Sequence, residues 1–421
     1  MKRYPSRSTQ TLFYGLSGVA GLFTALFVLI DVIAVNSVTD PFNYMFFTGV
    51  AGLITGIAIL MILSYWTVEK FGQEVPLGLV ADPAFRKKLL LPRTAMHYIA
   101  IASVFNVISA MIYFWAAASF DPTIILPLMQ FVVIYLVLIE FFIDRDIPSL
   151  IETQCLFSIA LGAFLATIKP GEIDLILVAL VLIPLNLGTT LSTYYQKKAK
   201  SYVSPSGEKV DAIRLRFWMV VGLAAGLTII SFPFLSLGAI REEIVLGLVI
   251  AGISMFLAFV AHVCYLRALG MGKMYVVEAV SSSKVIFTIP LTIAVAFLFP
   301  DWLPLESLDT IFWFIKVIGV VLVSLGVVVL ALAEVRQYLF IIVESGKDKE
   351  VMEALFAIKG VTSVAAVAGN LDIIAKVRVR TIGKTLGNII TRVEKIPGVR
   401  SLQTALILAE KERFGRSGAY R

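Results

Sequence analysis

The sequence predicts two domains. The first is an all-α polytopic membrane domain over residues 1–335, with ten helices in a five-plus-five inverted repeat, and the second is a small α+β ferredoxin-like domain over residues 336–421. Three observations lead to this prediction. Hydrophobic residues make up 59% of the 421 residues and charged residues only 15%, whereas about a quarter of a soluble protein is charged. Ten segments are apolar over the length of a membrane span. After Val335 the composition returns to the soluble range, with 23 charged residues in 86.

The first domain contains the ten predicted spanning helices. A spanning helix needs about 20 mostly apolar residues, because every backbone N–H and C=O in the hydrocarbon must be hydrogen-bonded within its own segment. The first apolar segment is longer than the core of a signal peptide and no small-residue cleavage site follows it, so we expect it to remain in the protein. The segments lie near residues 11–35, 42–66, 95–119, 122–143, 149–169, 174–194, 215–235, 244–269, 275–299 and 310–334.

The basic residues of the loops are sorted by side of the membrane. If the amino terminus is cytoplasmic, fifteen Lys and Arg residues fall on the cytoplasmic side, and only Lys169 and Arg241 fall on the other. Loops rich in Lys and Arg stay in the cytoplasm. Because ten spans are an even number, we expect a multi-pass protein of the cell membrane with both termini in the cytoplasm.

The net charge of +7 belongs to the second domain. Residues 1–335 carry 21 basic and 21 acidic residues, whereas residues 336–421 carry 15 and 8. A basic domain held near an anionic leaflet gains about 1 kcal/mol of attraction for each basic residue at the surface. We interpret the surplus as contact with the lipid bilayer, and we expect no nucleic-acid partner.

An internal repeat relates the two halves of the first domain. Asp144 and Asp301, at the ends of the fourth and ninth helices, are 157 residues apart, and Gly162 and Gly319 in the fifth and tenth helices share this offset. Five helices are an odd number, so the two copies enter the membrane in opposite directions. Inverted repeats of this kind are a common basis of alternating-access carriers. The repeats cover about residues 11–169 and 174–334.

These features resemble the drug/metabolite transporter (EamA-like) superfamily. The resemblance rests on the inverted five-plus-five arrangement, a short turn after Ala118 and Ala268, acidic residues at the ends of the fourth and ninth helices, and glycines in the fifth and tenth. It covers about residues 10–335 and implies the fold of a carrier. Two features depart from the superfamily: the repeated aspartates stand where a Gly-Glu pair is usual, and residues 67–94 form a long charged loop.

Lys284 is the predicted centre of a substrate site. It lies midway along the ninth helix, with Ser281 one turn earlier and Glu278 a further turn back. Ionisable residues at membrane depth are costly and mark functional sites, and a lysine among hydroxyls suits a carboxylate or a phosphate. The position resembles the helix-nine lysine of the sugar-phosphate and nucleotide-sugar branches of the superfamily. The alternative is a structural ion pair between Lys284 and Glu278 or another buried acid. Other polar side chains predicted to line the site are Tyr265, Asn186, Thr190, Gln130 and Asn106.

The sequence offers little for catalysis or metal binding. Two cysteines in apolar runs and two isolated histidines, His97 and His262, are too few for a metal site. His262 is interpreted as a packed core group, with proton relay as the alternative, and Arg267 is expected to reach the lipid headgroups. No nucleophile–base pair, phosphate loop or paired carboxylate motif stands out. We therefore expect no enzyme, no catalytic residue, no metal and no cofactor.

The second domain has the pattern β-α-β-β-α-β. The run YLFIIVE is followed by a helical pattern that ends at Gly360, and the strand-like runs VTSVAAVA and LDIIAKVRV are separated by a Gly-Asn turn. Apolar residues then recur at helical spacing up to Ile396, and SLQTALILAE follows as a strand. This order is that of the split ferredoxin-like unit.

The details of this domain resemble the effector-binding domain of the leucine-responsive regulator (Lrp/AsnC) family. The resemblance rests on GNLDIIAKV, KGV and PGVRSLQT, and covers about residues 337–411. It implies dimerisation through the sheets and binding of small amino acids at the subunit interface, with dimerisation alone as the alternative. In place of that family's DNA-binding helices, a spanning helix precedes the domain. The residues implied for effector binding are Gly369, Asp372, Ser401 and Thr404.

The sequence thus favours a secondary transporter, an exporter or exchanger of a small organic solute. Lys284 indicates an anionic group on the solute, and the regulator-like domain indicates an amino acid or related metabolite. The second domain would sense a small molecule or hold a homodimer together. Two alternatives stay open: a membrane-tethered amino-acid sensor or scaffold that transports nothing, and an exchanger of phosphorylated metabolites.

Overall fold

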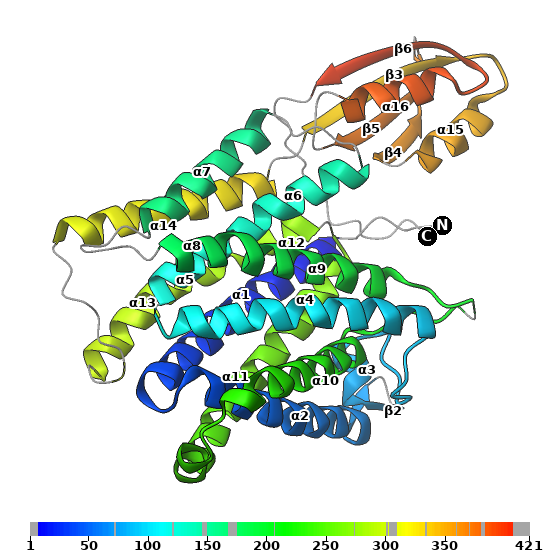
Figure 1. Cartoon of the computed structure of the whole chain (residues 1–421). Coiled ribbons are helices and arrows are strands. Elements are labelled where there is room, and N and C mark those ends of the chain that lie inside the picture. Colours follow the sequence, from blue (N-terminus) through cyan, green and yellow to red (C-terminus); the bar gives the residue numbers. More distant parts are fainter. Residues whose placement is uncertain are drawn as a thin grey trace. The chain divides into compact units, whose positions relative to one another are not determined.

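A computed structural model describes most of the chain, which forms two compact units (Figure 1). Several residues used in the predictions lie outside the described part, namely Lys169, Asp301 and the tail after Leu406. The described residues are 7–70, 73–119, 122–144, 150–166, 175–205, 207–272, 274–299, 302, 310–332, 335–358, 360–369, 371–379 and 384–406.

The N-terminal region is mostly helical, and each expected span contains helix. Eight helical segments of the described chain are long and apolar enough to cross a membrane, and two shorter apolar helices cover Thr153–Gly162 and Trp313–Gly326. This is the N-terminal region of a multi-pass membrane protein, while the count of ten spans stays a prediction. The helices are α1 (Arg7–Ser37), α2 (Pro41–Tyr65), α4 (Arg93–Ala117), α5 (Pro122–Met129), α6 (Phe131–Asp144), α7 (Leu150–Ala166), α8 (Leu175–Leu180), the π-helical η1 (Val181–Leu185), α9 (Asn186–Ser201), α10 (Ala212–Ser231), the short η2 (Phe232–Phe234), α11 (Leu237–Leu269), α12 (Met274–Ser281), α13 (Ser283–Leu298) and α14 (Thr310–Leu332).

Local sequence signals explain where several of these helices begin. Asp40 accepts hydrogen bonds from the amides of Phe42 and Asn43 at 2.9 and 3.1 Å, and Pro41 stands at the first helical position. Asp211 caps α10 in the same way through the amide of Arg214. Such caps satisfy amides that have no partner within the helix.

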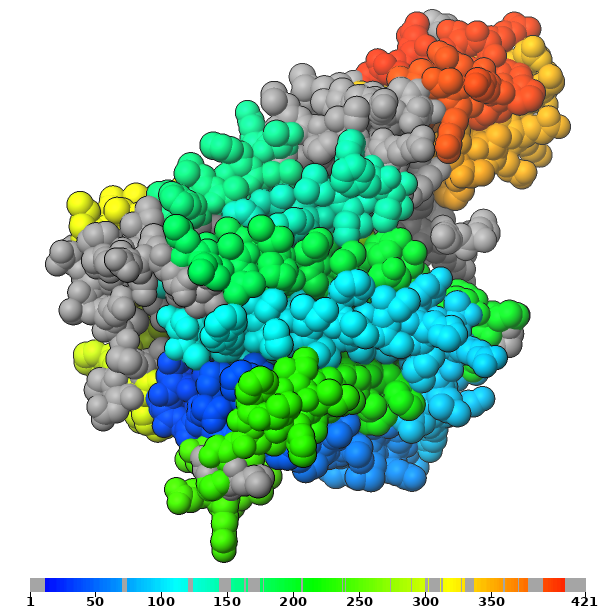
Figure 2. All heavy atoms as spheres, viewed as in Figure 1, coloured from blue at the N-terminus to red at the C-terminus, as the bar shows by residue number. Residues whose placement is uncertain are grey.

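The helices pack around α1, which contacts α11, α12 and α13. On the face of the bundle seen in Figure 2, α4 and α9 lie side by side. Large apolar side chains, such as Ile54 of α2 and Val104 of α4, remain exposed on the surface of the bundle. In a bilayer they would face lipid, which accepts them without the cost that water imposes.

Two of the expected spans are interrupted about a third of the way along their length. The fourth consists of α5 and α6, which are separated at Gln130, and the ninth consists of α12 and α13, which are separated at Ser282. In the sixth span, Pro184 lies in the π-helical η1, where the missing amide of proline disturbs the regular ladder. Helix α13 runs through Pro290, so the interruption of the ninth span lies eight residues before the proline, in the run of serines.

The loop between α2 and α4 is folded. Its residues form the hairpin strands β1 (Thr67–Lys70) and β2 (Gln73–Pro76) and the short helix α3 (Leu77–Ala81). Asp82 then accepts hydrogen bonds from the amide of Ala212 at 2.7 Å and from Lys200 Nζ at 3.0 Å. The charged loop is thereby fixed to the ends of α9 and α10.

The C-terminal domain is a four-stranded sheet with two helices packed on it. Every neighbouring pair of strands is antiparallel, in the order β4-β5-β3-β6, as the ferredoxin-like unit requires. Leu339 and Ile341 of β3 pack with Val351 and Leu355 of α15 in its core. The elements are β3 (Val335–Val343), α15 (Asp348–Ala357), β4 (Val361–Ala366), β5 (Ile373–Val379), α16 (Lys384–Glu394) and β6 (Val399–Leu406).

Candidate functional site

Lys284 and Glu278 form a buried ion pair. The Lys284 Nζ lies 2.8 Å from Glu278 Oε1, and the two side chains are 8% and 9% exposed. Positions six apart on a continuous helix point about 120° away from each other. The interruption at Ser282 lets the two side chains turn toward each other. The structure therefore places Lys284 in the paired arrangement that was the alternative to an open clamp.

The interruption is held by hydrogen bonds to the other interrupted span. The Ser282 hydroxyl donates to Gln130 Oε1 and also lies 2.8 Å from the Glu278 carbonyl. Gln130 in turn donates to the Leu126 carbonyl at 2.9 Å. Gly21 of α1 packs against the same point, where an added methyl group would lie 2.6 Å from the carbonyl oxygen of Ser281. The two interruptions are thus joined in the interior of the bundle.

Two hydroxyls lie beside the ion pair. Ser281 is 4% exposed, and its Oγ finds no hydrogen-bond partner within the described residues. Tyr265 of α11 is half-buried, with its hydroxyl enclosed beside Glu278 and Thr193. A buried hydroxyl without a partner costs free energy. The Ser281 hydroxyl therefore has unused hydrogen-bonding capacity within the described residues, while its role in substrate binding stays a prediction.

Two other predicted site residues, Asn186 and Thr190, are engaged with the backbone. Asn186 donates to the carbonyls of Val181 and Leu128 at 2.7 and 3.0 Å, and Thr190 donates to the Asn186 carbonyl at 2.7 Å. These bonds stabilise the helix around Pro184. Asn106 lies half-buried on α4, and its side chain makes no hydrogen bond within the described part of the chain.

A buried carboxylate escaped the sequence prediction. Asp31 of α1 is 4% exposed, and it accepts hydrogen bonds from Tyr44 at 2.8 Å, Tyr113 at 3.1 Å and Ser254. These donors come from α2, α4 and α11. The signal was present, since Asp31 is an acid inside the first apolar segment, and such acids mark functional or structural polar sites by default.

Arg216 was missed as well. It lies near the start of α10, is 3% exposed, and is the fifth residue of the helix. Its charge and that of Lys284 both act on His262 of α11. The His262 Nδ1 lies 2.7 Å from the Ala258 carbonyl, and the ring stacks on Phe27. This agrees with the interpretation of His262 as a packed core group.

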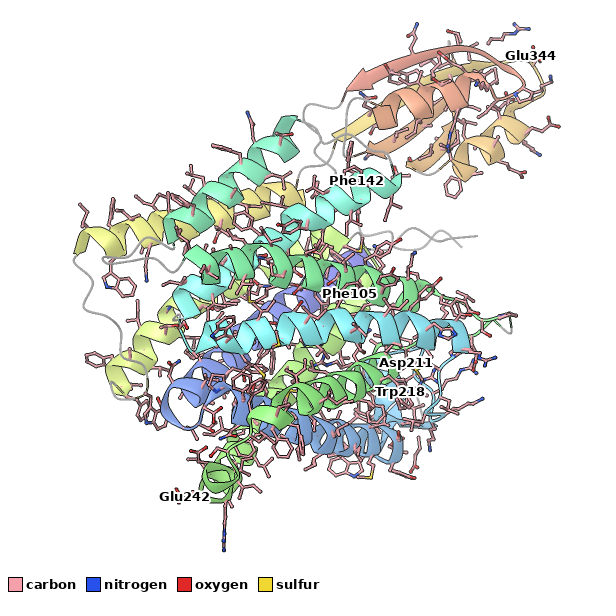
Figure 3. The ribbon with its side chains drawn as sticks, in the orientation of Figure 1. Phe105, Phe142, Asp211, Trp218, Glu242 and Glu344 are labelled. Carbon is pink, nitrogen blue, oxygen red and sulfur yellow. The ribbon has the colours of Figure 1, made fainter. Side chains whose placement is uncertain are left out.

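A second polar network lies where α9 ends and α10 begins. Figure 3 labels Asp211 and Trp218 there, and Glu242 at the other end of the bundle. Burial by itself raises the pKa of Asp82, but Lys200 and two amide donors outweigh this effect and hold the pKa below its ordinary value. Burial raises the pKa of Asp211 despite its ion pair with Arg214. These groups fix loops and are separate from the Lys284 cluster.

The predicted effector residues do not form one cluster. Gly369, with φ of +147°, and Asp372 lie in the β4–β5 connection. The Asp372 carboxylate accepts the Val343 amide at 2.8 Å, beside a register shift in β3. Ser401 and Thr404 are both exposed on β6, but they are three positions apart, so they point to opposite faces of the sheet. Asp372 therefore has a structural role whether or not an effector binds.

The comparison with protein families decides what the C-terminal domain is. Residues 338–415 match the family described as Lrp/AsnC ligand binding domain. They form an Lrp/AsnC domain. The match agrees with the expected limits of 337–411. The chain therefore combines a membrane-helix-rich N-terminal region with a domain similar to the Lrp/AsnC ligand binding domain. The N-terminal region lies outside this match.

Two further comparisons concern whole proteins. No curated protein matches the chain. A solved structure titled "Crystal structure of protein" aligns with 78% of this chain and 98% of its own, at 15% identity and with a TM-score of 0.49.

Proposed function

We propose that the protein is a secondary transporter, an exporter or exchanger of a small anionic or amino-acid-like solute, whose Lrp/AsnC domain senses a small molecule or holds a homodimer together. The observation that carries the proposal is the contact between the two interrupted spans. Gln130 and Ser282 meet in the interior, beside the Lys284–Glu278 ion pair and the unpartnered Ser281. Interrupted helices that meet near mid-membrane are typical of carrier substrate sites.

The packing of α7 against α14 supports an inverted repeat of the drug/metabolite transporter kind. Gly162 and Gly319 correspond in the repeat and lie against each other. Ser158 donates to the Leu322 carbonyl at 3.1 Å across the same pair of helices. Contact between equivalent residues is expected near a pseudo-twofold axis. The distribution of Lys and Arg supports both termini being cytoplasmic.

The open face of the C-terminal sheet supports a homodimer. Tyr338, Phe340 and Ile342 of β3 alternate with core residues and therefore point away from the helices, and Ile374 of β5 lies opposite Phe340. An apolar sheet face without covering helices is suited to packing on a second copy. If a ligand bound at such an interface, the concentration of that ligand would control how much of the protein is dimeric.

A membrane-tethered sensor without transport is the second candidate. The observation that favours it is the Lys284–Glu278 pair itself, because an ion pair that satisfies both charges needs no substrate. The same pair weakens the phosphorylated-metabolite exchanger, since a lysine neutralised by a carboxylate attracts a phosphate dianion poorly.

Counterflow in proteoliposomes distinguishes a carrier from a sensor. Purified full-length protein is reconstituted into vesicles loaded with one unlabelled amino acid or organic acid at a time, and uptake of the labelled compound is followed. A carrier accumulates label only in the matched vesicles. If every compound gives the uptake of empty vesicles while the purified protein still binds an amino acid in calorimetry, the sensor is the correct function.

A further inference from the structure

Arg216 carries a positive charge in the interior of the helix bundle. It is 3% exposed, and its Nε is fully enclosed. Among the residues that the structure describes, none accepts a hydrogen bond from Arg216, and no acidic side chain acts on its charge. A buried charge normally has a partner, because its removal from water is otherwise too costly. Within the described residues, Arg216 therefore lacks both a hydrogen-bond acceptor and a negative charge to balance its own.

Arg214, two positions earlier on α10, has the ion pair and the hydrogen-bond acceptor that Arg216 lacks. Arg214 forms an ion pair with Asp211 and donates to the Lys88 carbonyl at 2.8 Å. Two positions along a helix differ by about 200° in direction, so Arg216 points to the other side of α10. Arg216 begins about 6 Å inside the helix, where a side chain on the lipid face could reach the headgroups. Its burial shows that it does not lie on that face.

The groups that the structure records near Arg216 supply no negative charge to balance it. His262 of α11 is close enough for the charges of both Arg216 and Lys284 to act on its ring. The Lys284 charge is compensated by Glu278. The charge of Arg216 has no such compensation in the described chain, and this makes Arg216, rather than Lys284, the cation that lacks an anion.

We propose that Arg216 binds the carboxylate of a small organic anion between α10, α11 and α13. The planar guanidinium presents paired N–H donors that match the two oxygens of a carboxylate. The bound anion would supply the missing acceptors and the missing negative charge together. As a statement about the transported solute, the proposal rests on the carrier function proposed above. As a statement about binding, it stands by itself.

Thermal unfolding of full-length protein in detergent tests the proposal without any transport. Acetate, succinate and inorganic phosphate are added at matched ionic strength to the wild type and to the R216M, R216K and R241M variants. Arg241 is exposed and serves as a matched loss of charge. A carboxylate should raise the Tm of the wild type and of R241M in proportion to the logarithm of its concentration. R216M should lose this rise, and R216K should need about ten times more anion for it.

The Tm values of the variants should also differ when no anion is added. R216M removes an uncompensated buried charge, so its Tm without anion should equal or exceed that of the wild type, whereas an arginine needed only for structure would give a lower Tm. The proposal is overturned if no carboxylate raises the wild-type Tm, if R216M responds as the wild type does, or if phosphate alone acts. Carboxylate binding that requires Arg216, together with no counterflow, would refute the carrier and leave this site. Counterflow that R216M preserves would exclude Arg216 from binding the transported solute and leave the carrier.

Discussion

Gly162 and Gly319 bring the backbones of α7 and α14 into contact. A methyl group added at Gly162 would lie 2.5 Å from the Gly319 carbonyl oxygen and 2.7 Å from the Val323 nitrogen. Both obstacles are backbone atoms, so the helices would have to separate. Close approach through small residues is a main source of helix association in membranes, where the hydrophobic effect does not drive it.

Gly162→Ala should therefore destabilise the protein by about 1–3 kcal/mol, the usual cost of overpacking. Gly252→Ala on α11 is the matched control, because no atom lies within 4 Å of the added methyl group. The control should leave the Tm unchanged or raise it through its better helix propensity. Equal Tm values for the two variants would contradict the contact.

Lys284 and Glu278 should behave as a coupled pair. Lys284→Met leaves the Glu278 carboxylate buried without its cation, and Glu278→Gln leaves the ammonium without its anion. Each single change should cost about 3–5 kcal/mol, whereas the double variant should recover most of this loss. Reversible unfolding of the four proteins measures the coupling. Additive losses would show that the two charges do not stabilise each other.

Asp82 should make the stability of the protein depend on pH at the acid end. The pKa of Asp82 in the folded protein lies below its ordinary value, which is about 4. Its contribution is therefore complete above that ordinary value and is lost as the pH falls through the lower folded pKa. Asp82→Asn lacks this contribution, so its Tm should lie below that of the wild type at neutral pH. This difference in Tm should become smaller below about pH 4. Glu242→Gln, which removes an exposed acid, should show no such gap.

Asp31 should stabilise the packing of four helices. Asp31→Asn replaces one carboxylate oxygen by an amide that cannot accept the hydroxyls of Tyr44, Tyr113 or Ser254. One or two donors then lose their acceptor, at a cost of about 1–3 kcal/mol. Asp40→Asn keeps an N-capping side chain at the start of α2 and serves as the control. An unchanged Tm for Asp31→Asn would show that water replaces the lost acceptor.

The sequence predicted the secondary structure and the two domains better than it predicted the contacts of individual buried side chains. Hydropathy runs predicted the helices, and strand and helix periodicity predicted the C-terminal domain, because both patterns follow from which side of an element is buried. The pairing of Lys284 with Glu278 was only an alternative, because it depends on an interruption at Ser282 for which the sequence shows three serines and a proline elsewhere. Arg216 was not among the predicted site residues, since a sequence does not show how a helix is rotated about its own axis. One signal was available: Arg214 and Arg216 cannot share a helix face, so one of them must point inward.

A substitution of Asp372 tests whether the turn before β5 serves structure or effector binding. Its carboxylate accepts the Val343 amide at 2.8 Å, and its own amide donates to the Ile341 carbonyl at 3.2 Å. Asp372→Ala should remove the first bond and keep the second, because only the first uses the side chain. Hydrogen exchange followed by mass spectrometry on full-length protein should then speed up in the peptide that contains Val343, while peptides of β4 keep their wild-type rates. Ser401→Ala is the control, because Ser401 is exposed on β6 and should leave both peptides unchanged. Wild-type exchange at Val343 in Asp372→Ala would free Asp372 from the structural role and strengthen its assignment to an effector.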